Sequence, residues 1–129
     1  MKQNIAHITL LVNDYDETIA FYTQQLQFSI LENIHGEDGR RWVTLAPKGN
    51  PGSALALIKA ETPAQKERVG NQTGGGVSFF LNTDNIERDL NHFRQQQVTI
   101  TREIVDEPWG KVAIFADLYG NLWDLIESA

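Results

Sequence analysis

The chain has 129 residues, of which 41% are hydrophobic and 22% charged, values typical of one compact globular domain. Its formal net charge of −6 opposes binding to nucleic acid or to an anionic membrane surface, because such binding depends on clustered Lys and Arg. It has no cysteine, which excludes disulfides, thiolate metal ligands and cysteine nucleophiles. The sequence shows neither a secretory signal nor a membrane-spanning stretch, so we expect a cytoplasmic protein.

A strand followed by a capped amphipathic helix is predicted twice along the chain. Residues 5–12 form a strand-like run, and Asn13-Asp14 after it favours a helix start before apolar residues at helical spacing. Residues 77–81 repeat the strand, and Thr83-Asp84 is a second capping pair before apolar residues at the same spacing. This recurrence indicates an internal repeat.

Three further strand candidates follow each predicted helix. They are residues 29–34, 41–46 and 54–59 in the first half, and residues 98–105, 111–116 and 122–127 in the second. Gly- and Pro-rich turns are expected between them at 36–39, 47–52, 107–110 and 119–121. The order is βαβββ twice, which predicts an α+β fold of two pseudo-symmetric modules. We expect one domain over residues 1–129, with module one at about 1–60, a connector at about 61–74 and module two at about 75–129.

The connector itself contains signals for a short helix. Thr62 is placed as an N-cap, Pro63 suits the first helical position, and Gly70 is expected to close the helix. The run Gly74-Gly75-Gly76 resembles a phosphate cradle only superficially, because no Lys-Ser/Thr follows and the chain continues into a strand. We therefore interpret it as a hinge between the modules.

Three segments form a pattern that covers nearly the whole chain. They are Ile5-Ala6-His7-Ile8-Thr9-Leu10, Ala20-Phe21-Tyr22 ahead of Leu26-Gln27-Phe28, and the closing run from Phe115 to Glu127. Together they resemble the vicinal oxygen chelate superfamily, which includes glyoxalase I, fosfomycin-resistance transferases, bleomycin resistance proteins and extradiol dioxygenases. The sequence departs from the family pattern at Gln27, where a helix-ending Gly is usual, and at Leu118, where Pro is common.

The resemblance implies a cleft between the modules in which the first and last strands of each module hold a divalent metal ion. The first-strand positions match His7 and Gly76, and the last-strand positions match Ala56 and Asp124. Only His7 and Asp124 could bind a metal ion, whereas open catalytic metal sites generally have about three protein ligands. The family's metal site is therefore expected to be incomplete, so no cofactor is assigned and a divalent metal stays possible.

The two surviving polar positions are also the candidate catalytic residues. Strand alternation places His7 on the same face as Thr9, where it is expected to line the cleft or to bind metal. Asp124 is expected to project into an apolar surface, so it needs a partner, which could be His7, an Arg, water, a metal ion or the substrate. A His–Asp pair would also form a plausible proton-transfer unit. The other histidines, His35 and His92, are expected to be exposed.

Aromatic and amide side chains complete the candidate binding site. Trp42 and Trp109 lie near predicted strand starts and could form aromatic walls, although core packing is the more ordinary role of a tryptophan. Trp123 is expected to point into the core. Asn71 could edge the cleft, but a solvated loop explains it equally well. The candidate substrate-binding residues are His7, Thr9, Trp42, Asn71, Trp109 and Asp124.

Three functional hypotheses follow from these residues. The first is a divalent-metal-dependent lyase, isomerase or dioxygenase acting on vicinal oxygens. The second is a metal-free protein that binds a small molecule, similar to the bleomycin resistance branch, and the missing ligands and acidic charge favour it. The third is metal-free acid–base catalysis by His7 and Asp124. Open sheet edges and the resemblance also suggest a homodimer.

Overall fold

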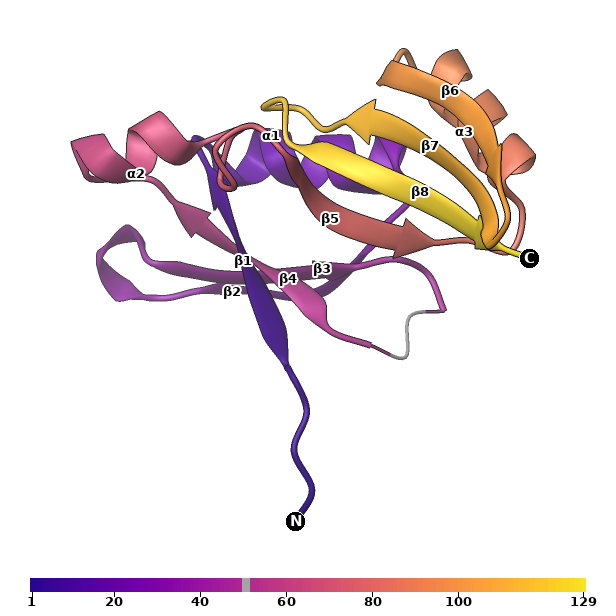
Figure 1. Cartoon of the computed structure of the whole chain (residues 1–129). Coiled ribbons are helices and arrows are strands. Elements are labelled where there is room, and N and C mark those ends of the chain that lie inside the picture. Colours follow the sequence, from indigo (N-terminus) through magenta and orange to yellow (C-terminus); the bar gives the residue numbers. More distant parts are fainter. Residues whose placement is uncertain (50–51) are drawn as a thin grey trace. The chain divides into compact units, whose positions relative to one another are not determined.

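The computed structural model describes residues 1–49 and 52–129, which divide into two compact units, Met1–Lys66 and Glu67–Ala129 (Figure 1). Each unit holds a four-stranded sheet together with helical segments, so the predicted α+β class is confirmed. The boundary between the units falls inside the stretch that was predicted as a connector. Of the turn predicted at 47–52, Asn50 and Pro51 lie outside the described residues.

Every strand predicted from the sequence is present, with ends that differ from the prediction by at most two residues. The first unit contains β1 (His7–Val12), α1 (Tyr15–Ala20), η1 (Phe21–Gln25), β2 (Ser29–His35), η2 (Glu37–Gly39), β3 (Arg41–Ala46) and β4 (Ala54–Lys59). The second contains β5 (Val77–Asn82), α3 (Ile86–Gln95), β6 (Thr99–Glu107), β7 (Gly110–Ala116) and β8 (Leu122–Ser128), and α2 (Pro63–Arg68) spans the boundary.

The two sheets have the same topology, which confirms the predicted pseudo-symmetric modules. The strand order is β1-β4-β3-β2 in one and β5-β8-β7-β6 in the other, and in each the first strand runs parallel to the last. Even an irregularity repeats, because the register shifts between Ile30 and Glu32 in β2 and between Ile100 and Arg102 in β6. Such a shift is a β-bulge, which bends the strand at the same place in both sheets.

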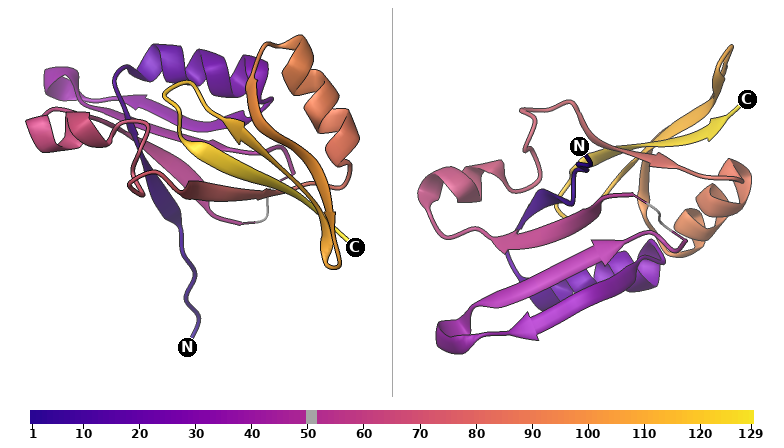
Figure 2. Two further views of the ribbon diagram at one scale, coloured as in Figure 1. Left: turned by 45° about the horizontal axis from the view of Figure 1, so that its top comes forward. Right: turned by 90° about the horizontal axis from the view of Figure 1, so that it is seen from below.

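In the first unit, α1 and η1 lie along one face of the sheet (Figure 2). Asp14 caps α1, as predicted, by accepting a hydrogen bond of 2.8 Å from the Glu17 amide. The helix widens in η1, where the Leu26 amide donates to the Phe21 carbonyl at 3.3 Å, and Tyr22 there is fully buried. The face of the sheet toward this helix therefore forms the core of the first unit.

In the second unit the N-cap of α3 is Asn85, so the predicted capping pair Thr83-Asp84 is wrong by one position. The Asn85 side chain accepts a hydrogen bond of 3.0 Å from the Arg88 amide. Asp84 instead pairs with the Arg88 guanidinium at 2.7 Å, and this hydrogen bond holds the pKa of Asp84 below its usual range and raises that of Arg88. The Glu127 side chain accepts from the Ile86 amide at 2.9 Å, which joins the start of α3 to β8.

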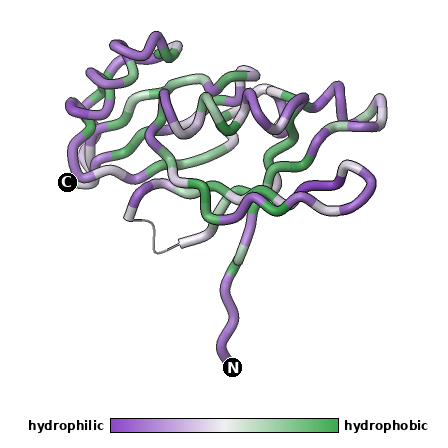
Figure 3. The backbone as a smooth tube through the Cα atoms, turned by 180° about the vertical axis from the view of Figure 1, so that it is seen from behind, coloured by the Kyte–Doolittle hydropathy of each residue, from purple (hydrophilic) through white to green (hydrophobic). Residues whose placement is uncertain are grey.

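Aromatic packing fills the core of the second unit. Trp123 is only 3% exposed and stacks on Phe115 with a centroid distance of 5.8 Å, which confirms its predicted inward orientation. The helix α3 is hydrophilic over most of its length in Figure 3, with hydrophobic stretches where its core residues lie. His92 on this helix is half-buried with its Nε2 shielded, so the expected exposure was wrong, whereas His35 is exposed as predicted.

The connector forms the short helix that its sequence predicts. The Thr62 hydroxyl accepts a hydrogen bond from the Gln65 amide at 3.1 Å, and the Gln65 side chain accepts one from the Thr62 amide at 3.2 Å. This reciprocal pair is a capping box, and it confirms Thr62 as the N-cap. Gly70, with φ +85°, packs so closely on the Tyr119 backbone that an added Cβ would lie 2.0 Å from its carbonyl oxygen. None of the described helices combines the length and apolar character needed to cross a bilayer.

Candidate functional site

The side of the first sheet opposite α1 presents polar and aromatic side chains from β1, β2 and β3, and only alanine methyl groups from the part of β4 between them. In β1, Leu10 and Val12 are fully buried while His7 and Thr9 are exposed, but Ile8, which strand alternation places on the same face as Leu10, is exposed as well. Residues paired across neighbouring strands project to the same side of a sheet. One such row contains Thr9 of β1, Ala56 of β4, Thr44 of β3 and Glu32 of β2. We call the surface formed by this row with His7 and Trp42 the Trp42 face.

His7 and Trp42 meet edge to face on this surface, with ring centroids 5.2 Å apart and an angle of 79° between the rings. They belong to β1 and β3, and β4 lies between these strands. The rings can meet because Ala54 and Ala56 of β4 carry only methyl groups on this side. Trp42 is 37% exposed, so core packing does not account for it.

Glu32 fixes the Trp42 ring. The Trp42 indole N–H donates to Glu32 Oε1 at 2.9 Å, and the buried Thr44 hydroxyl donates to the same oxygen at 3.2 Å. A satisfied indole N–H and an adjacent imidazole edge restrict rotation of the tryptophan side chain. The result is a partly exposed aromatic surface that is already ordered before any ligand arrives.

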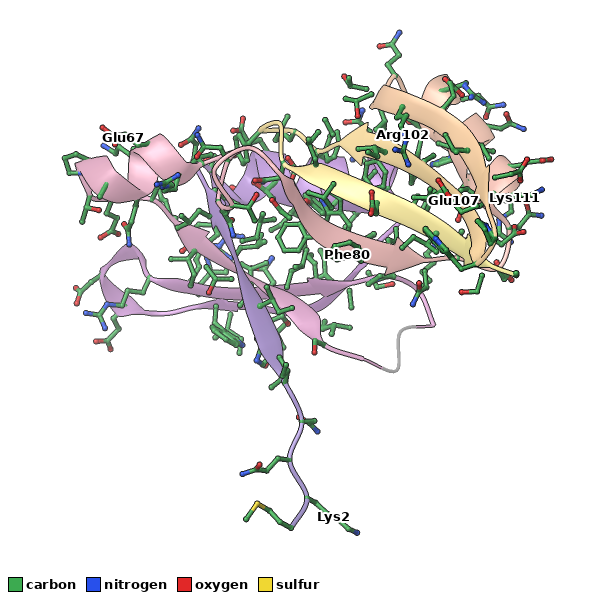
Figure 4. The ribbon with its side chains drawn as sticks, in the orientation of Figure 1. Lys2, Glu67, Phe80, Arg102, Glu107 and Lys111 are labelled. Carbon is green, nitrogen blue, oxygen red and sulfur yellow. The ribbon has the colours of Figure 1, made fainter. Side chains whose placement is uncertain are left out.

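The second sheet presents a corresponding surface with different chemistry. The row equivalent to Thr9, Ala56, Thr44 and Glu32 contains Phe80 of β5, Asp124 of β8, Ile114 of β7 and Arg102 of β6. Phe80, which Figure 4 shows on β5, is 67% exposed. Asp124 beside it is half-buried, and its carboxylate has no hydrogen-bond or ion-pair partner among residues 1–49 and 52–129. We call this surface the Phe80 face.

The other two candidate binding residues do not belong to either row. Asn71 is exposed in the loop after α2, where its backbone bonds to Arg68 and Gly74. Trp109 is 54% exposed in the turn between β6 and β7, so it is not a core residue. Gly110, next to it, pairs with Ser128, four residues beyond Asp124 in β8 and therefore roughly 13 Å along the strand. The sheet register does not bring Asn71 or Trp109 to Asp124.

The positions implied by the resemblance do not complete a metal site. Gly76 precedes β5 and is not part of the strand. In the second sheet the residue equivalent to His7 is Val77, because Val77 pairs with the start of β8 as His7 pairs with the start of β4. Valine offers no metal ligand. The Trp42 face thus supplies His7 with Ala56, and the Phe80 face supplies Asp124 with an apolar neighbour. No group of three or more His, Asp or Glu side chains suited to a metal ion occurs among the described residues. The residues present do not fit the family's metal.

His7 and Asp124 belong to different units, so their approach to one another stays a prediction. The same holds for the cleft that the resemblance implies.

Sequence reasoning missed Glu32, Phe80 and Arg102. Phe80 was assigned to a strand but not to a face, and strand alternation with the buried Phe79 could have indicated its exposure. Glu32 and Arg102 each follow a bulge, which shifts the alternation and hides their orientation in the sequence.

Comparison with known proteins identifies the family. The model of the Glyoxalase/Bleomycin resistance protein/Dioxygenase superfamily matches residues 4–125. The chain belongs to this superfamily. The family match confirms the resemblance inferred from the sequence.

Relatives match over nearly their full length. An "Uncharacterized protein" of Shewanella frigidimarina is 46% identical over 98% of this chain and 95% of its own. The crystal structure of UcmS2 is 28% identical with a TM-score of 0.84 and covers 98% of both chains. TnmS3, an antibiotic binding protein from Streptomyces sp. CB03234, is 25% identical with a TM-score of 0.80, covering 99% of this chain and 98% of its own.

Proposed function

We propose that this protein binds a small molecule with an aromatic ring on the Trp42 face and that binding needs no metal ion. The observation that carries the proposal is the contact between His7 and Trp42, with the indole N–H of Trp42 held by Glu32. A partly exposed aromatic ring surrounded by a few fixed polar groups is typical of small-molecule sites. The similarity to TnmS3, an antibiotic binding protein, supports a small molecule as the ligand.

The chemistry of the remaining donors favours binding over metal-dependent catalysis. His7 is the only family-position ligand on the Trp42 face, and Ala56 takes the place of the second. A lone imidazole among the expected donors does not hold a catalytic divalent ion tightly. The metal-dependent lyase, isomerase or dioxygenase remains the alternative function, and His7 with Asp124 remain its candidate residues. The homodimer and the cytoplasmic location stay predictions.

The test is a fluorescence titration with three aromatic probes of different charge: the cation proflavine, neutral N-phenyl-1-naphthylamine and the anion 1-anilinonaphthalene-8-sulfonate. We expect saturable binding of at least one probe, with the same Kd before and after dialysis against EDTA. Trp42→Ala should weaken that binding about tenfold or more, because it removes the aromatic surface. Tyr15→Ala, which removes an aromatic ring of α1 on the opposite side of the same sheet, is the matched control and should leave Kd unchanged.

Two results would contradict the proposal. One is that no probe binds in a manner that depends on Trp42. The other is that EDTA abolishes binding and one equivalent of a divalent ion restores it, which would favour the metal-dependent alternative.

A further inference from the structure

We infer that the Trp42 face selects ligands with a positive charge beside a flat aromatic ring, and that Glu32 recognises this charge. The inference rests on the proposed function, because it names the class of ligand for the same surface. It depends on the geometry of one carboxylate and on the residue that occupies the equivalent position in the second sheet.

Glu32 has one oxygen in use and one available. Its Oε1 accepts both hydrogen bonds, from the Trp42 indole at 2.9 Å and from the Thr44 hydroxyl at 3.2 Å. Its Oε2 has no hydrogen-bond partner within the described part of the chain, and Glu32 is exposed. The two donors fix the carboxylate next to the indole, so the free oxygen lies beside the aromatic surface. A ligand that stacks on Trp42 can place an ammonium or amidinium group against it.

The basic side chain next to Trp42 in β3 does not neutralise this negative charge. Arg41, the adjacent residue to Trp42 in β3, is turned the other way, because its guanidinium pairs with Asp16 of the α1 helix at 2.9 Å and lies 5.2 Å from the Tyr15 ring centroid. Glu32 is the only carboxylate in strands β1 to β4, and it shares a face with Trp42. A cationic ring also gains from the electron-rich face of tryptophan.

The fold does not require an acid at this place. The equivalent position after the bulge of β6 is Arg102, which is exposed and has no side-chain partner in the ranges that the structure describes. Figure 4 shows Arg102 on β6, and Glu32 occupies the corresponding strand of the other sheet. Because the same backbone accepts either charge, we attribute the negative charge on the Trp42 face to ligand choice.

The experiment compares proflavine, a flat cation, with 1-anilinonaphthalene-8-sulfonate, an anion, on the wild type and on Glu32→Gln. Glutamine keeps an oxygen that can accept from Trp42 and Thr44 but removes the charge. We expect the wild type to prefer proflavine and Glu32→Gln to weaken proflavine binding about tenfold, as expected when a charged partner that is open to solvent is lost. Binding of the anion should be unchanged or stronger.

Two controls separate recognition from a structural effect. Glu67→Gln removes the same charge from α2, on which Figure 4 labels Glu67, and should leave both dissociation constants unchanged. Raising the salt concentration should weaken proflavine binding to the wild type more than to Glu32→Gln, because salt screens the ion pair with Glu32 that only the wild type can form. Near-ultraviolet circular dichroism of Glu32→Gln should keep the wild-type tryptophan signal.

The outcomes distinguish this inference from the proposed function. If the dyes bind through Trp42 but the anion binds as tightly as the cation, or if Glu32→Gln and Glu67→Gln behave alike, the charge selection is wrong and the binding function stands. If neither dye nor the neutral probe depends on Trp42, both are wrong.

Discussion

At the scale of single residues, Asp117 shows how one side chain fixes a turn. It is 6% exposed, its Oδ1 accepts the amides of Tyr119 at 3.1 Å and Asn121 at 2.9 Å, and its Oδ2 accepts from the Asn121 side chain at 2.9 Å. The turn joins β7 to β8, the strand that carries Asp124. Asp117 and Asn121, which belong to the closing run that resembles the family, therefore hold this turn together.

We predict that Asp117→Ala lowers the free energy of unfolding by about 2–4 kcal/mol, because it leaves buried amide donors without acceptors. Asp117→Asn should cost less, since its carbonyl oxygen can still accept the backbone amides. Urea unfolding followed by circular dichroism measures both. A loss for Asp117→Ala no larger than that of a surface substitution would contradict this account.

Residue orientation was predictable from the sequence only where a strand alternates regularly. In β1 alternation placed His7 and Thr9 on one face and Leu10 on the buried face, but it did not predict that Ile8, on the face of Leu10, is 45% exposed. The pairing of Glu32 with Trp42 did not, because it depends on how β2 aligns with β3 across a bulge. Register arises from the packed sheet and is not encoded in a single strand.

At the scale of elements, both helices that cover the sheets end at a residue with an unusual backbone. Gln27 has φ +63° and Gln97 has φ +62°, each shortly before a strand begins. This left-handed conformation is strained for residues with a side chain and favours glycine. The departure noted at Gln27 thus puts a residue with a side chain in a conformation that favours glycine, and Gln97 repeats it in the second unit.

We therefore expect Gln27→Gly and Gln97→Gly each to raise the free energy of unfolding, by about 0.5–1 kcal/mol after the extra freedom of glycine in the unfolded chain is counted. Gln27→Val should lower it, since a β-branched side chain tolerates this conformation worst. Thermal unfolding of the three variants against the wild type measures the order. Equal or lower stability for both glycine variants would contradict the strain argument.

The elements themselves were predictable because their signals are local. Thr62, Pro63 and Gly70 mark the short helix α2 through caps that act within a few residues. The start of α3 was misplaced because Thr83, Asp84 and Asn85 can all cap a helix, and in the structure Asn85 is the cap while Asp84 pairs with Arg88. Local sequence predicts that a cap is present, and side-chain partners decide which residue provides it.

At the scale of the whole molecule, the chain repeats one topology with two chemistries. The Trp42 face combines an imidazole, an indole and a carboxylate, and the equivalent row of the Phe80 face combines Asp124 with Arg102 and an exposed phenyl ring. Each unit retains one of the two donors that the family pattern places in it. The repeat was visible in the sequence, but the divergence of the two faces required the strand register.

The division of the metal-ligating residues between the two units predicts a low metal content. With one protein ligand per unit, His7 and Asp124, a divalent ion has at most two of the about three ligands that open catalytic sites use. The neighbours Ala56 and Val77 also offer no group to orient those ligands. Protein purified without chelators and then dialysed should contain far less than one equivalent of zinc, iron, manganese or nickel by elemental analysis. His7→Ala and Asp124→Ala should leave that low content unchanged. Near-stoichiometric metal in the wild type that is lost in both variants would overturn the metal-free proposal, because it would mean that the two residues bind one ion together with a ligand that neither face supplies.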